Sequence, residues 1–143
     1  MKADPRTEAE VRAALGRFTD SYAKKDMEGM LACVAPDPDV VLFGTGADEK
    51  RIGLAEIQLQ AERDWSQTEA ISMNFDWMSI SAAGPVAWAA VEGAFQIRAG
   101  GQEFRMPARG SFVLEKRGDK WLVVHSHFST PAAGQEEGES IPA

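Results

Sequence analysis

The sequence predicts an α+β domain in which a curled antiparallel sheet wraps around N-terminal helices. Apolar residues recur at three- and four-residue intervals before about position 67, and at two-residue intervals after about position 69. The later segments are long, and the Gly-rich turns between them are too short for a parallel crossover, so we expect a meander. A chain of 143 residues is long enough for one hydrophobic core.

A first helix is expected over Thr7–Lys25. Thr7 with Glu10 three residues later fits a capping box, and Ala13-Ala14 favours helix. One apolar stripe would face the core, formed by Val11, Leu15, Phe18 and Tyr22.

Two further helices and a short strand follow. Asp26 would cap a second helix that ends at Pro36-Asp37-Pro38, because proline lacks an amide hydrogen and has a fixed φ. A strand is expected at Val40–Phe43, and a third helix over about Gly53–Gln67. The third helix would bury Leu54, Ile57, Ala61 and Trp65.

Four strands complete the predicted domain. Their expected spans are Ile71 to the Gly84-Pro85 turn, Val86–Arg98, Gln102–Lys116 and Lys120–Ser129. Gly93, Pro107 and Gly110 are natural bulge or bend positions inside such strands. A sheet that curls there and receives helices on its concave side makes a cone with an open mouth.

Composition limits the partners. The net charge of −7 disfavours nucleic acid and anionic membranes, because both would repel the protein. The single cysteine, Cys33, cannot form an internal disulfide and is expected as a buried, unreactive thiol. No signal-peptide core or apolar run long enough to span a bilayer is visible, so we expect a cytoplasmic protein. Residues 1–131 would form one domain, and residues 132–143 a disordered acidic tail.

Both histidines lie in the last predicted strand. Simple alternation places His125 and His127 on the same face as Trp121 and Val123. Two imidazoles on the face that closes a core need partners, which indicates a candidate pocket. The alternative is that both are hydrogen-bonded residues without a ligand.

A second candidate group lies on the two preceding strands. Arg109 would lie beside the histidines, and a guanidinium inside an apolar cone needs an anion. A ligand carboxylate or enolate could supply it, or Glu92 could form an ion pair. Glu92 shares a face with Trp88, and alternation leaves open whether that face is inward.

Metal and cofactor binding are not expected. The His-x-His pair needs a third ligand, and no second cluster of metal-ligating residues is visible in the sequence. The glycines at 44 and 46 lack the pattern of a phosphate-binding loop.

This layout resembles the nuclear transport factor 2-like superfamily, and within it the SnoaL-like group, over about residues 7–131. The resemblance rests on the order of helices and strands and on Lys120-Trp121-x-x-Val124-His125-x-His127-x-Ser129. The same ending, with Arg109-x-Ser111-x-Val113, is also similar to the association domain of calcium/calmodulin-dependent protein kinase. The resemblance to the superfamily implies a cone-shaped, cystatin-like fold and a homodimer formed through the outer sheet face.

The resemblance also tests one activity. If Asp26 is aligned with the helix-turn aspartate of the superfamily's steroid isomerases, the tyrosine position falls on Phe18 and the catalytic aspartate position on or beside Phe43. Neither phenylalanine can transfer a proton, so steroid isomerisation is rejected. Tyr22, on the stripe with Phe18, could still reach the cone with its hydroxyl.

Three functions remain open. The first is a homodimeric SnoaL-like pocket protein that binds a small, mostly apolar ligand with a carbonyl or carboxylate. The second is a metal-independent isomerase, cyclase or dehydratase that uses acid–base chemistry. The third is an assembly domain. The candidate pocket residues are His125, His127, Arg109, Glu92, Trp88, Phe43, Tyr22 and Phe18.

Overall fold

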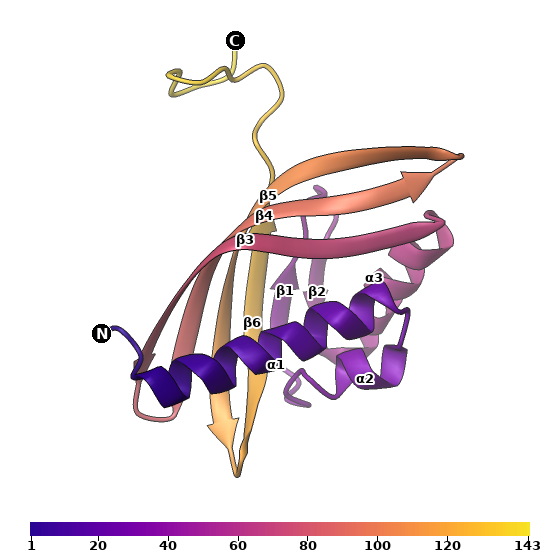
Figure 1. The fold of residues 1–143 in the computed structure, drawn as a ribbon. Coiled ribbons are helices and arrows are strands. Elements are labelled where there is room, and N and C mark those ends of the chain that lie inside the picture. The colour runs from indigo at the N-terminus through magenta and orange to yellow at the C-terminus, as the bar shows by residue number, and fades with distance from the viewer.

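The computed structural model describes all 143 residues and confirms the α+β fold class. Three helices lie at one side of a strongly curled, unclosed sheet, and α1 crosses its concave face (Figure 1). The elements are α1 (Pro5–Ala23), α2 (Met27–Leu31), β1 (Val41–Phe43), β2 (Lys50–Ile52), α3 (Gly53–Ser66), β3 (Ala70–Ala83), β4 (Val86–Ala99), β5 (Gln102–Arg117) and β6 (Lys120–Ser129).

The six strands form one sheet in the order β2-β1-β6-β5-β4-β3. The four long strands form the expected antiparallel meander. The short strand β1, whose pairing the sequence did not predict, joins β6 in parallel. The short strand β2 was not predicted. It returns antiparallel to β1 after a tight loop and leads directly into α3.

The first helix begins earlier than the sequence pattern indicated. Asp4, rather than Thr7, is the N-cap: its carboxylate accepts a hydrogen bond from the Thr7 backbone N–H at 2.9 Å. Pro5 follows at the first helical position, where its missing N–H costs no hydrogen bond. The Thr7–Glu10 capping box is therefore wrong, and Glu10 instead contacts Trp121 and Lys116.

Two irregularities in the ladders shape the sheet. Between β3 and β4 the register shifts after Phe75, opposite Gly93. A Cβ on Gly93 would lie 1.9 Å from the Asn74 carbonyl oxygen, so the close approach of the strands requires glycine. Between β5 and β6 the register shifts at Val113, which leaves Val124 as an extra residue in β6.

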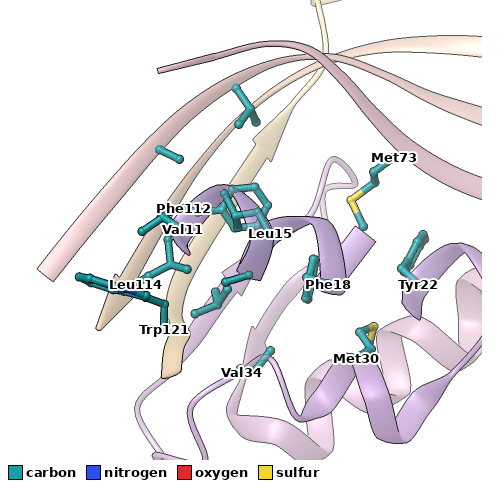
Figure 2. Close-up of a cluster of buried hydrophobic side chains, with 14 of the residues drawn as sticks. Val11, Leu15, Phe18, Tyr22, Met30, Val34, Met73, Phe112, Leu114 and Trp121 are labelled. Carbon is teal, nitrogen blue, oxygen red and sulfur yellow. The ribbon is translucent and has the colours of Figure 1, made fainter. Parts of the chain in front are cut away.

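The core lies between α1 and the concave face of the sheet (Figure 2). The buried stripe of α1 matches the sequence prediction and packs against Phe112 and Leu114 of β5. Phe112 contacts Phe18 edge-on at 5.9 Å between ring centroids, and Phe128 at 5.4 Å. These aromatic contacts hold the helix stripe against the curled strands.

Residues 130–143 extend away from the sheet and contain neither helix nor strand (Figure 1). Most of their side chains are exposed. Disorder of the acidic tail stays a prediction. None of the helices has the length and hydrophobicity needed to cross a bilayer.

Candidate functional site

A half-open cavity of about 190 Å³ lies between the helices and the wide end of the curled sheet. Every helix and five of the six strands contribute to its wall. Eleven of the sixteen lining residues are hydrophobic, and no lysine or arginine is among the sixteen. The lining residues are Phe18, Tyr22, Met30, Leu42, Gly44, Thr45, Glu49, Ile57, Gln60, Ala61, Asp64, Ile71, Met73, Phe95, Met106 and Phe128.

The polar groups of the cavity gather on one side, where α1 meets α3. The Tyr22 hydroxyl donates a hydrogen bond to Asp64 Oδ2 at 2.7 Å. The Gln60 side-chain amide donates to Asp64 Oδ1 at 2.8 Å, from one turn earlier on α3. Tyr22 and Gln60 are only 5% and 7% exposed. Figure 2 shows Tyr22 at the end of α1, on the same side of the core as Met30 and Met73.

A second layer of charges anchors the β1–β2 loop to α3. Glu49 accepts hydrogen bonds from Arg63 at 2.9 Å, from Gln60 at 3.1 Å and from the Gly46 backbone N–H at 2.8 Å. Arg63 also donates to Asp48 at 2.8 Å. These contacts hold the loop that forms part of the cavity wall.

Burial changes the titration of the Tyr22–Asp64 pair. Loss of solvent raises the pKa of the Asp64 carboxyl above its ordinary value, against the opposing hydrogen bonds from Tyr22 and Gln60. The pKa of Tyr22 is also raised, first by burial and then by the negative charge of Asp64. Asp64 is thus a carboxyl that favours its protonated form more than a solvated aspartate does.

The histidines do not lie on the face that the sequence predicted. Trp121 and Val123 are buried, but beyond the extra residue Val124 the alternation restarts with Ser126 and Phe128 inward. His125 and His127 therefore lie on the outer, convex face. The prediction that they share a face with Trp121 and Val123 is wrong, because simple alternation cannot anticipate a β-bulge.

Four other predicted pocket residues share that outer face. Arg109 donates to Glu92 at 3.0 Å across the β4–β5 ladder, with its side chain 79% exposed. Trp88 lies on the same face of β4 as Glu92, and Phe43 packs its ring against His127 at 5.2 Å between centroids. The expected ion pair is present, but it is a solvated surface pair. Of the eight candidates, only Phe18 and Tyr22 line the cavity.

His125 has a local partner. Its Nδ1 lies 2.7 Å from the Val41 carbonyl oxygen, and because a carbonyl only accepts, Nδ1 carries the hydrogen. No group of three or more His, Cys, Asp or Glu side chains is arranged to hold a metal ion.

Apart from Tyr22, the polar residues of the cavity were missed in the sequence. Gln60 and Asp64 lie four residues apart and flank the apolar stripe of α3, which places them on its inner edge. That spacing was the available signal, but exposed helix faces carry polar pairs at the same spacing. Glu49 lies in a loop and offered no periodic signal.

Comparison with solved structures identifies the same fold in proteins of low sequence identity. A nuclear transport factor 2-like superfamily protein from Salmonella enterica serovar Typhimurium is 21% identical, with a TM-score of 0.83 over 97% of this chain and 100% of that one. A candidate dehydratase of the same family from Streptomyces avermitilis is 17% identical, with a TM-score of 0.82 over 90% and 100%. A candidate calcium/calmodulin-dependent protein kinase II association domain from Xanthomonas campestris is 24% identical, with a TM-score of 0.74 over 87% of each chain.

Comparison with curated proteins gave no significant sequence match. The sequence model of the SnoaL-like domain, however, matches residues 11–133, which include every residue that lines the cavity. The chain therefore belongs to the family of SnoaL-like domains.

Proposed function

We propose that this protein binds a small, mostly apolar organic molecule in the cavity between α1, α3 and the sheet. The observation that carries the proposal is a hydrocarbon-lined cavity whose polar groups converge on one half-buried carboxyl, Asp64. Ligand sites typically combine an apolar wall with a few placed polar groups. The cavity is half-open, so a small molecule can enter it from solvent.

The polarity of the cavity favours a neutral ligand. A ligand carboxylate was expected because of Arg109, but that side chain lies on the outer face. Within the cavity an anion would meet Asp64 and Glu49 and no lining cation. Burying such an anion without an opposite charge would be unfavourable.

Native mass spectrometry of the protein purified from cells tests the proposal directly. We expect a bound small molecule, and we expect Ala61→Leu to release it because the larger side chain fills the cavity. Ala55→Leu is the matched control, since Ala55 is exposed on the same helix. Equal ligand occupancy in the two variants would rule out this cavity as the site.

Acid–base catalysis is the second candidate, favoured by the raised pKa of Asp64 beside the Tyr22 hydroxyl. Ionised Asp64 could take a proton from the carbon next to a ligand carbonyl. The C–H electron pair would form a C=C bond while the carbonyl electrons move to oxygen. Protonated Asp64 would no longer need the Tyr22 hydrogen, which could then stabilise that oxygen. Such chemistry is common to isomerases, cyclases and dehydratases.

Hydrogen exchange distinguishes catalysis from binding. If the protein is an acid–base catalyst, wild-type protein should speed exchange of the α-hydrogens of 4-methylcyclohexanone in heavy water, followed by NMR, and Asp64→Asn should abolish the effect. Glu92→Gln is the control, because Glu92 is an exposed carboxyl on the outer face. If wild-type protein exchanges these hydrogens no faster than Asp64→Asn does, catalysis is ruled out and the binding function remains.

We also propose a homodimer through the outer sheet face, which would equally suit an assembly domain. Trp77 is 55% exposed there, and Phe43 and Trp88 lie half-buried on the same face. A large aromatic in water favours a partner surface. Sedimentation should show a dimer that Trp77→Lys disrupts. Phe104→Lys, at a similarly exposed aromatic whose strand partner Ile97 packs toward the core, should remain dimeric.

A further inference from the structure

We propose that the ligand is a neutral, single-ring molecule whose hydroxyl donates a hydrogen bond to the Tyr22–Asp64 pair: a phenol or a cyclic alcohol. This inference rests on the proposed binding function and names the class of ligand. Two features of the cavity support it: the hydrogen-bond donors of Tyr22 and Gln60 are already used, and the cavity is small.

The orientation of the Gln60 amide is fixed by its neighbours. Arg51 Nε lies 2.8 Å from Gln60 Oε1, and a guanidinium can only donate, so this atom is the amide oxygen. The amide nitrogen then faces two carboxylates, Glu49 at 3.1 Å and Asp64 at 2.8 Å. Both of its hydrogens are therefore used, and Gln60 has no donor left for a ligand.

The same holds for Tyr22, whose single hydroxyl hydrogen goes to Asp64 Oδ2. Each Asp64 oxygen accepts one hydrogen bond and retains a further lone pair, and the Tyr22 oxygen can still accept. The half-buried Thr45 hydroxyl makes no hydrogen bond within the protein and can turn either way, so it sets no preference. With Asp64 ionised, the buried polar side of the cavity is thus an acceptor site that lacks a donor.

A ligand hydroxyl fits this site better than a carbonyl or a carboxylate. It supplies the missing hydrogen, whereas a carbonyl oxygen placed at the Tyr22–Asp64 pair would meet only acceptors and a carboxylate would also meet like charge. The cavity should discriminate strongly between a hydroxyl ligand and the other two, because a mismatched buried polar group loses its hydration without gaining a partner.

Size restricts the ligand to one ring. A dry protein cavity of about 150 Å³ holds benzene, so about 190 Å³ accommodates one ring with one or two small substituents. A second fused ring would have to protrude through the opening. Phe18, Phe95 and Phe128 offer aromatic contacts to such a ring, and Met30, Met73 and Met106 are flexible enough to close around it.

Isothermal titration of the full chain with three probes of one shape tests the inference. The probes are 4-methylphenol, 1,4-dimethylbenzene and 4-methylbenzoate, which differ only in the group opposite the methyl. We expect 4-methylphenol to bind about tenfold more tightly than 1,4-dimethylbenzene, from one hydrogen bond to a charged acceptor. We expect no measurable binding of 4-methylbenzoate.

Two variants locate the preference. Asp64→Asn should reduce the phenol preference to about twofold or less while 1,4-dimethylbenzene binds as before, which also shows that the cavity is folded. Tyr22→Phe should keep or increase the preference, because it leaves Asp64 Oδ2 without its donor. If 1,4-dimethylbenzene or 4-methylbenzoate binds wild type at least as tightly as 4-methylphenol, the hydroxyl inference is wrong and the cavity proposal stands. If no probe binds and native mass spectrometry finds no small molecule, both fail.

Discussion

Tyr22 and Asp64 are 42 residues apart in the chain, and their side chains meet at 2.7 Å inside the cavity. One comes from the last turns of α1 and the other from α3, so the contact also fixes how these helices pack. Trp65, the residue after Asp64, adds an indole N–H hydrogen bond to the Tyr22 carbonyl oxygen at 3.1 Å. The candidate site and the junction of the two helices are therefore built from the same contacts.

Tyr22→Phe should lower the free energy of unfolding by about 1–2 kcal/mol, because Asp64 loses a hydrogen-bond donor in a poorly solvated place. Urea denaturation at neutral pH measures the loss. In an Asp64→Asn background the same substitution should cost clearly less, since the charged acceptor is gone. An identical loss in both backgrounds would show that the two side chains are not coupled.

Asp64 should make the protein less stable as pH rises. Its folded pKa is raised above the ordinary 3.8, so the folded state holds its proton more tightly than the unfolded state does. The stability it contributes is fully present below 3.8 and is lost as pH rises through the folded pKa. Between about pH 4 and pH 7, the free energy of unfolding of wild type should fall relative to that of Asp64→Asn, as measured by chemical denaturation. A constant difference across this range would contradict the prediction.

Glu10 should act in the opposite direction. Hydrogen bonds from the Trp121 indole and the Lys116 ammonium lower its pKa from 4.5 to about 2. Its stabilising contribution is present above 4.5 and is lost as pH falls toward 2. Thermal melts of wild type and Glu10→Gln should therefore converge on acidification. Curves that stay parallel down to about pH 2.5 would show that the hydrogen bonds do not depend on the charge.

Arg109→Ala should leave the cavity unaffected. The side chain is 79% exposed and pairs only with Glu92, so we expect a change in unfolding free energy within about 0.5 kcal/mol. Titration with 4-methylphenol should give the wild-type affinity. A marked loss of affinity would restore the sequence-based hypothesis that Arg109 holds the ligand.

Two glycines should respond to alanine in opposite ways. Gly93→Ala places a Cβ 1.9 Å from the Asn74 carbonyl oxygen, and because the clash is with backbone we expect a loss of about 3 kcal/mol or more. Gly16 lies within α1 with no atom near its missing Cβ, so Gly16→Ala should stabilise by about 0.5–1 kcal/mol. Chemical denaturation of both variants provides the comparison. Equal changes in the free energy of unfolding for the two variants would mean that the bulge opposite Gly93 adjusts to the added Cβ without cost.

The sequence alone determined the fold class, the buried stripe of α1 and the long antiparallel strands, because these follow from local periodicity. Tertiary structure decided which groups share the cavity. One extra residue, Val124, moves His125 and His127 to the outer face, and no local pattern marks such a bulge. Asp64 becomes a site residue only when α3 packs beside Tyr22, since its burial and its hydrogen bonds come from residues far away in the chain.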